Sequence, residues 1–220
     1  YDTNPDVAAS GFRRRPLVPA KVVGTYRVLR QDMIPAHQEF YTQGEYDIAP
    51  LIAAKSPRYR FMELGRSCVL KPYRNKRTVE LLWQGLWSYV REHDIDVMIG
   101  CASFLGTDPA EHEMALSFLY HEALAAPDWY VRAHDRLHVE MNRVPKEKID
   151  VKAALKAMPP LIKGYVRAGC RFGCGAVVDN QFNTTDVCVM LDMATVDNKY
   201  RQRFTHDDPS DDEADPTRQI

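Results

Sequence analysis

Basic side chains are concentrated between Arg58 and Arg77, in a stretch whose one acidic residue is Glu63. Its basic members are Arg58, Arg60, Arg66, Lys71, Arg74, Lys76 and Arg77. Several of them fall between the end of a predicted strand and the start of a predicted helix, where unpaired backbone N–H groups and the helix dipole both attract anions. The stretch therefore predicts a phosphate-binding site. The alternative is a solvated basic edge.

Glu63 is the candidate general base, because it lies within a predicted strand beside the opening into the basic loop. A carboxylate placed there is suited to take a proton from an attacking group. The alternative is a structural ion pair with Arg60 or Arg66, since perturbed carboxylates serve both purposes. Ser103 is a second candidate, at the end of a strand where α/β proteins usually bind ligands. Cys101 is less suited to covalent chemistry, because a buried cysteine is usually inert.

A third polar group lies between the last two predicted strands. It consists of Asn183, Thr185 and Asp186. These side chains are suited to hold the polar head group of a substrate. The alternative is that they shape a turn, since Asn and Asp side chains readily hydrogen-bond the nearby backbone.

Metal-ligating residues do not occur at recognised spacings. The pairs His112–Glu113 and His121–Glu122 each lack the second histidine of an HExxH zinc site. Cys170 and Cys174 have no partner pair at the spacing of a zinc ribbon. The sequence therefore predicts no metal site.

The elements that must position these residues form a predicted strand–helix–strand unit. The strands are Tyr59–Val69 and Ile95–Phe104, and the helix runs from Thr78 to His93 with Asn75 as its N-cap. The helix carries apolar residues at helical spacing, namely Val79, Leu82, Trp83, Leu86 and Val90. The second strand is nearly continuously apolar, as in the middle of a covered sheet. Such a unit predicts that its two strands are parallel.

The rest of the sequence supplies further strands and helices. Strands are predicted at 21–30, 170–179 and 186–192, and helices at 48–55, 108–125, 152–158 and 161–168, while 129–142 has no assignment. The predicted fold class is a mixed α/β domain with a central parallel βαβ unit.

Composition narrows the class of protein. The chain has 220 residues, with 29 basic and 30 acidic side chains, and this balance argues against a nucleic-acid binder. Six of the acidic residues lie within 206–220, which leaves 28 basic and 24 acidic residues elsewhere, so the body is positively charged. The five cysteines indicate a reducing, cytoplasmic compartment rather than a disulfide framework. No apolar run approaches the length of a membrane-spanning helix.

Three parts are expected along the chain. Residues 1–19 form a polar segment, 20–204 a single domain, and 205–220 an acidic disordered tail. The sequence begins at Tyr1 rather than Met, so we expect that an N-terminal strand and helices of the fold are missing.

Several segments, taken in order, resemble the GNAT-type acyltransferases, and most closely the bacterial L-ornithine N-alpha-acyltransferases of ornithine-lipid biosynthesis. The segments are 63–69, 72–83, 99–104, 165–170, 179–186 and 190–192. The resemblance spans about residues 21 to 193. It implies a GNAT-like fold and transfer of a 3-hydroxyacyl group from acyl carrier protein to the alpha-amine of L-ornithine, giving lyso-ornithine lipid.

The same resemblance implies roles for the candidate residues. The donor's phosphopantetheine arm would contact Arg66, Lys71, Arg74, Lys76 and Arg77, and no cofactor would be tightly bound. The ornithine head group would contact Asn183, Thr185 and Asp186, with Glu63 and Ser103 as the catalytic pair. Because the product is a lipid, peripheral contact with the inner membrane is also implied.

The phosphate loop departs from the general GNAT pattern Gln/Arg-x-x-Gly-x-Gly/Ala. Arg74 fits the first position, but Arg77 and Val79 stand where small residues are expected. Glycines there let backbone amides wrap the pyrophosphate of coenzyme A. The departure therefore favours acyl carrier protein, which brings a single phosphodiester and is acidic enough to bind a basic rim.

Two other functions are compatible with these residues. An acyl-homoserine-lactone synthase would share the fold and the carrier protein, with S-adenosylmethionine as acceptor. An inactive remnant would only bind acyl carrier protein. Analysis of the product separates all three.

Overall fold

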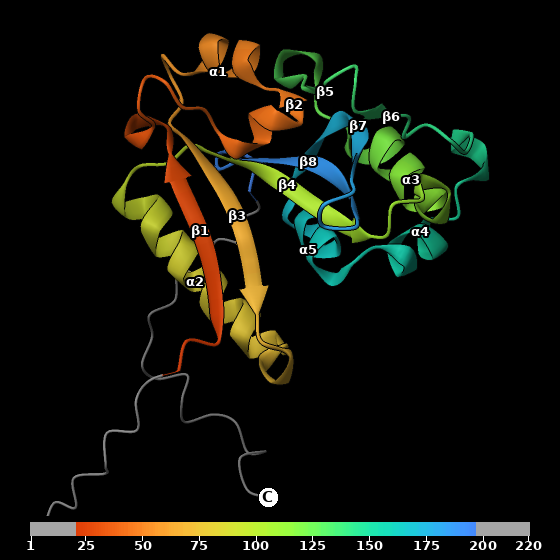
Figure 1. Ribbon diagram of the computed structural model, residues 1–220, viewed down its shortest axis with the longest axis horizontal. Coiled ribbons are helices and arrows are strands. Elements are labelled where there is room, and N and C mark those ends of the chain that lie inside the picture. Colours follow the sequence, from red (N-terminus) through yellow and green to blue (C-terminus); the bar gives the residue numbers. More distant parts are fainter. Residues whose placement is uncertain (1–20, 197–220) are drawn as a thin grey trace, which may run out of the picture.

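The computed structural model describes residues 21–196, so the predicted polar segment 1–19 and the predicted tail 205–220 lie outside the described residues. Within that range the strands form one sheet in the order β1-β3-β4-β8-β7-β5-β2, with β6 also paired to β7 (Figure 1). The strands are β1 (Gly24–Arg30), β2 (Tyr46–Asp47), β3 (Phe61–Val69), β4 (Val97–Leu105), β5 (Arg132–Ala133), β6 (His138–Val139), β7 (Arg171–Asp179) and β8 (Thr184–Asp192). The sheet is mixed, which confirms the predicted α/β class.

Helices connect these strands. The α-helices are α1 (Ala49–Lys55), α2 (Lys76–Glu92), α3 (Glu113–Ala123), α4 (Val151–Ala157) and α5 (Pro160–Ala168). Short 3₁₀ helices are η2 (Gln31–Met33), η3 (Tyr41–Gly44), η4 (Lys71–Tyr73), η5 (Pro109–His112), η6 (Pro127–Trp129) and η7 (Lys146–Lys148). The helix predicted at 108–125 thus begins as the 3₁₀ helix η5, and the unassigned stretch 129–142 contains the two-residue strands β5 and β6. No described helix is long and apolar enough to cross a membrane.

Alternation along the strands separates two cores, one on each face of the sheet. In β4, Met98 and Phe104 face a core built with α2, α3, α4 and α5. Val97 and Ile99 face the other core, which includes Phe40, Tyr46, Ile48 and Leu51 from the segment before β3. The segment 31–58 therefore covers one face of the sheet, and the larger helices cover the other.

Helix α2 forms where its apolar spacing predicts it. Asn75 caps its N-terminus by accepting a hydrogen bond from the Thr78 backbone N–H, as predicted. The side chains Trp83, Leu86, Trp87 and Val90 are buried against the sheet. Val79, predicted on the buried face, is instead 42% exposed, because it lies in the first turn beside the exposed basic loop.

The predicted parallel unit is present, but its two strands pair for a short distance. Phe61–Glu63 of β3 pairs with Val97–Ile99 of β4 in parallel. Beyond Glu63, and among the described residues, β3 pairs only with β1 and β4 only with β8. Figure 1 shows β3 and β4 starting together and then running apart. This separation creates an opening in the middle of the sheet.

Candidate active site

The opening between β3 and β4 reaches into the core on the α2 side. A cavity of about 30 Å³ lies there. Its lining comes from both strands and both neighbouring helices, and includes Leu64, Trp83, Gly100, Cys101 and Tyr165. A Cβ built on Gly100 would approach the Leu64 carbonyl oxygen to 2.4 Å, so glycine is required where the strands diverge. At this volume the cavity has room for only about one or two water-sized groups, so it marks where the two strands part and does not itself hold an acyl chain.

The basic loop lies between β3 and α2, as predicted. The side chains of Lys71, Arg74, Lys76 and Arg77 are exposed. Arg74 donates from Nε to the Val69 carbonyl at 2.9 Å, and Lys76 lies 3.7 Å from a carboxylate oxygen of Glu80. The structure therefore brings these four predicted residues together beside the N-terminus of a 17-residue helix.

Arg66 lies apart from that loop, in the middle of β3. Its backbone is in the left-handed region, with φ of 51°, where the pairing of β3 with β1 is irregular. Its guanidinium lies 5.5 Å from the ring centroid of Tyr41 and 5.0 Å from that of Phe182. Arg66 therefore connects η3 to the turn between β7 and β8, on the face of the sheet that the segment 31–58 covers.

Glu63 is buried, with 1% of its surface exposed. Its Oε1 accepts hydrogen bonds of 2.6 Å from both the backbone N–H and the hydroxyl of Thr42. Its Oε2 accepts from the Tyr41 backbone N–H at 3.1 Å and from Arg27 Nη2 at 3.2 Å. The ion-pair partner is therefore Arg27, rather than the expected Arg60 or Arg66. Four donors already occupy this carboxylate.

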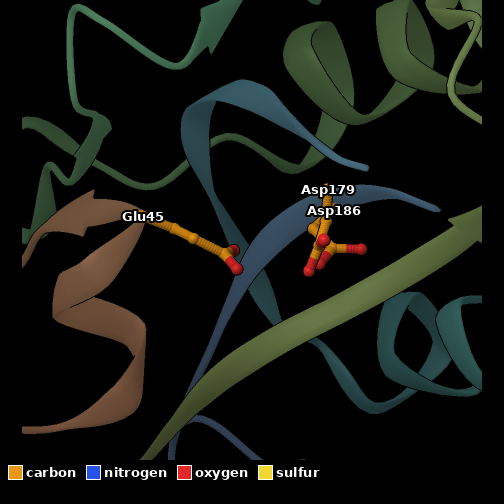
Figure 2. A group of neighbouring side chains, drawn as sticks. All are labelled: Glu45, Asp179 and Asp186. Carbon is orange, nitrogen blue, oxygen red and sulfur yellow. The ribbon is translucent and has the colours of Figure 1, made fainter. Parts of the chain in front are cut away.

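Three other carboxylates meet on the same face of the sheet. Glu45 precedes β2, Asp179 ends β7, and Asp186 lies in β8. One oxygen of each lies within 4.8 Å of one oxygen of both others. Figure 2 shows Glu45 extending toward the adjacent side chains of Asp179 and Asp186. We call these residues the acid cluster, and their oxygens are of the kind that bind ammonium groups or hard metal ions.

Local contacts fix the members of the acid cluster. The hydroxyl of buried Tyr46 lies 3.1 Å from the Gly175 carbonyl oxygen and 3.0 Å from that of Asp186, which anchors Glu45 beside β8. Asp179 Oδ1 accepts from the backbone N–H groups of residues 181 and 182 at 2.7 and 3.1 Å. The cluster is therefore built by the sheet and by one tight turn.

Burial changes the protonation of the acid cluster. Loss of solvent raises the pKa of Glu45 to about 7; a hydrogen bond with Cys101 opposes the rise, and the charges of Asp186, Asp179 and Glu63 add to it. Burial likewise raises the pKa of Asp186, an effect that the Ser103 hydroxyl opposes. Glu45 can therefore exchange a proton near neutral pH.

The predicted residues Ser103 and Cys101 lie next to this cluster on β4. Ser103 is exposed and pairs with Asp186 across the β4–β8 ladder. Burial, with the charge of Glu45, raises the pKa of the Cys101 thiol well above its ordinary value, which disfavours a thiolate nucleophile. Cys101 therefore serves as a contact between Glu45 and the opening.

The predicted polar group Asn183, Thr185 and Asp186 is not brought together. Asn183 is exposed, with φ of 55°, in the turn between β7 and β8. Thr185 is buried and donates to the Gly106 carbonyl at 2.9 Å. Only Asp186 belongs to the acid cluster, because neighbouring residues in a strand face opposite sides of the sheet.

Sequence reasoning missed Glu45 and Asp179. Glu45 lies between the strand predicted at 21–30 and the helix predicted at 48–55, where no element is predicted, and Asp179 is predicted only as the last residue of a strand. One signal was available for Asp179, because a turn joining two antiparallel strands brings residues on its two sides together. No local pattern pointed to Glu45.

Comparisons with known proteins agree with this architecture. A family model described as an acetyltransferase (GNAT) domain matches residues 13–84. The L-ornithine N(alpha)-acyltransferase of Agrobacterium fabrum is 56% identical over 180 residues, which are 82% of this chain and 61% of the relative. That of Rhizobium meliloti is 50% identical over 187 residues, 85% of this chain and 63% of the relative. No solved structure matches the chain.

The chain spans less than two thirds of the length of these two relatives. A third relative is covered more fully. This is the L-ornithine N(alpha)-acyltransferase of Rhodobacter capsulatus, which is 43% identical over 185 residues, 84% of this chain and 70% of the relative. Identity of this extent confirms the resemblance that the motifs carried. The chain therefore belongs to the L-ornithine N(alpha)-acyltransferase family.

Proposed function

We propose that this chain transfers a 3-hydroxyacyl group from acyl carrier protein to the alpha-amine of L-ornithine, giving lyso-ornithine lipid. The observation that carries the proposal is the opening between β3 and β4, which has the basic loop at its end and the acid cluster on the face covered by 31–58. The names of the relatives support ornithine as the acceptor. The basic loop supports acyl carrier protein as the donor.

On the donor side, the exposed cations of the basic loop suit the phosphodiester of a phosphopantetheine arm. This phosphodiester would be bound by the side chains of Lys71, Lys76 and Arg77 and by the first backbone N–H groups of α2. Residues 77 and 79 are arginine and valine, whose side chains hinder the close backbone wrap that a pyrophosphate needs. The positive rim also attracts an acidic carrier protein.

On the acceptor side, the amine attacks the thioester carbonyl directly. A C–N bond forms, the C–S bond breaks, and the carrier leaves as a thiolate that accepts the proton removed from the amine. The attacking nitrogen must lose a proton, and Glu45 is suited to take it because its pKa is raised to about 7. Glu45 also contacts Cys101, which lines the opening. The base therefore lies beside the position of the thioester.

Glu63 has a different part in this proposal. Its four hydrogen bonds leave little capacity for a substrate proton, and they hold Tyr41 and Thr42 against the sheet. Glu45 follows Thr42 by three residues. We therefore assign Glu63 as a positioning residue for Glu45. Ser103 is assigned to orient Asp186.

The donor preference is tested with the purified chain and L-ornithine, by comparing 3-hydroxyacyl carrier protein with the same acyl group on coenzyme A. We expect kcat/KM for the carrier protein to be higher by at least about 100-fold, and to fall as salt is added. Equal turnover with both donors would rule out the carrier-protein assignment. A lactone formed from S-adenosylmethionine would replace the ornithine assignment.

A further inference from the structure

The acid cluster lacks a counter-charge among the residues that the structure describes. Among residues 21–196, no lysine, arginine or histidine nitrogen lies within 4.0 Å of a carboxylate oxygen of Glu45, Asp179 or Asp186. Three neighbouring carboxylates repel one another, and burial strengthens the repulsion. A cationic ligand would relieve it.

Buried oxygens without partners point to the same position. Asp186 and Thr184 are 6% and 7% exposed, and their Oδ1 and Oγ1 atoms have no partner at hydrogen-bond geometry among the described residues. The Thr184 hydroxyl is nevertheless close enough to Asp186 to oppose the rise of its pKa, so it lies at the acid cluster. Glu45 Oε2 is buried and without a partner in the same way. Leaving such an atom unsatisfied is unfavourable, because its lost hydrogen bonds with water are not replaced. A ligand that donates several hydrogen bonds would satisfy all three.

The spacing of the carboxylates fits an ammonium group. Hydrogen bonds of about 2.9 Å, arranged tetrahedrally around a nitrogen, place the acceptor oxygens about 4.7 Å apart. One oxygen from each member of the cluster lies within 4.8 Å of the others. An ammonium can therefore donate to Asp179, Asp186 and one oxygen of Glu45, which leaves the second oxygen of Glu45 to the alpha-amine.

Such a site is unsuited to the amine that reacts. Carboxylates stabilise the charged form of an amine, and a protonated amine has no lone pair with which to attack a thioester. The ammonium in the acid cluster must therefore belong to a part of the acceptor that does not react. For ornithine, that part is the amine at the end of the side chain.

We propose that Asp186 and Asp179, with Glu45 beside them, bind the side-chain ammonium of the acceptor and so select an amino acid that carries a second amine. The inference rests on the proposed acyl transfer to ornithine. It assigns the specificity of the acceptor site to three residues.

Distances along β4 agree with this placement. Ser103, opposite Asp186, is two to three residues from the opening at Gly100 and Cys101, or about 7–10 Å at the usual strand rise. The two nitrogens of extended ornithine are about 6 Å apart. An attacking nitrogen adds roughly 3 Å to the carbonyl carbon. The alpha-amine therefore reaches the opening when the side-chain ammonium lies in the acid cluster.

Binding in this subsite also acts on the base. The charges of Asp186 and Asp179 help to raise the pKa of Glu45. A bound ammonium opposes those charges and favours ionised Glu45. An acceptor without the second amine therefore loses turnover as well as affinity.

The test compares L-ornithine with L-norvaline, which has the same carbon skeleton and no second amine. For the parent chain we expect kcat/KM to favour ornithine by at least about 100-fold, since sites that bind a substrate N–H reject analogues without it. Asp186→Asn should reduce this ratio to below about 10-fold, chiefly because kcat/KM for ornithine falls. Glu147→Gln removes an exposed acid elsewhere and should leave the ratio unchanged.

Thermal stabilisation by each amino acid gives a second readout that does not need turnover. Ornithine should raise the melting temperature of the parent, and neither norvaline nor calcium ions should match it. Asp179→Asn supplies a second variant if Asp186→Asn does not fold. Equal stabilisation by norvaline, an unchanged ratio in the folded variants, or stabilisation by calcium ions alone would overturn the subsite. Selective stabilisation by ornithine without acyl transfer would support the ammonium subsite and refute the proposed function.

Discussion

Two hydrogen bonds of 2.6 Å join Thr42 of η3 to Glu63 of β3, one from the backbone N–H and one from the hydroxyl. They tie the segment before β3 to the sheet at the last residue of β3 that pairs with β4. Glu45 is the first residue after η3, so these two hydrogen bonds also set the distance between the acid cluster and the opening. Glu63 thus connects the stability of the fold with the geometry of the site.

Replacing Glu63 tests whether it positions or reacts. Glu63→Gln presents an amide N–H₂ to donors that need an acceptor, so we expect a loss of about 2–4 kcal/mol in the free energy of unfolding. Urea unfolding measures this, with Asp32→Asn, at an exposed ion pair, as the control expected within about 0.5 kcal/mol of the parent. Unchanged stability with abolished turnover would restore Glu63 as the base.

The pH dependence of turnover tests Glu45. A base must be ionised to act, so protonation of Glu45 contributes a limb on which kcat/KM falls about tenfold for each pH unit below about 7, in addition to the fall caused by protonation of the ornithine alpha-amine. In Glu45→Gln we expect turnover to drop about 10²–10⁴-fold and this limb to disappear. Titration of the ornithine amine affects parent and variant alike, so their ratio isolates Glu45. An identical pH profile in the variant would exclude the role.

The approach of Leu64 to Gly100 tests the opening. A Cβ at position 100 would meet the Leu64 carbonyl oxygen at 2.4 Å, and a backbone atom cannot swing aside. Gly100→Ala should therefore cost about 1–3 kcal/mol of stability and reduce turnover with the acyl donor. Gly164→Ala is the matched control, because no atom of the described residues lies within 4 Å of a Cβ there. Parent-like stability and turnover in Gly100→Ala would show that β3 can move freely.

Reversing charge on the basic loop tests donor binding. Lys71→Glu with Arg77→Glu should raise KM for the acyl carrier protein by at least roughly tenfold and weaken the salt dependence, with KM for ornithine unchanged. Lys152→Glu with Lys156→Glu, two exposed changes on α4, makes the same change in net charge and is the control. The assignment fails if the control has the same effect as the loop variant.

Much of the fold could be predicted from the sequence, because the patterns that indicate helices and strands involve residues close together in the chain. The apolar spacing of α2, its cap at Asn75 and the apolar run of β4 each depend on residues near one another, and together they predicted the parallel unit. The acid cluster depends on contacts between distant segments, since Glu45 lies more than 130 residues before Asp179 and Asp186. Which face each carboxylate takes is set by strand register. The basic loop was predictable, and the acceptor site was not.

The central claim is tested most directly by the position of the new amide. The chain is incubated with 3-hydroxyacyl carrier protein and L-ornithine labelled with ¹⁵N at the alpha-amine only, and the product is fragmented in a mass spectrometer. We predict a single acyl group on the labelled nitrogen and an unlabelled, free amine on the side chain. Acylation of the side-chain nitrogen, or no transfer to ornithine under conditions where the chain is folded, would contradict the account.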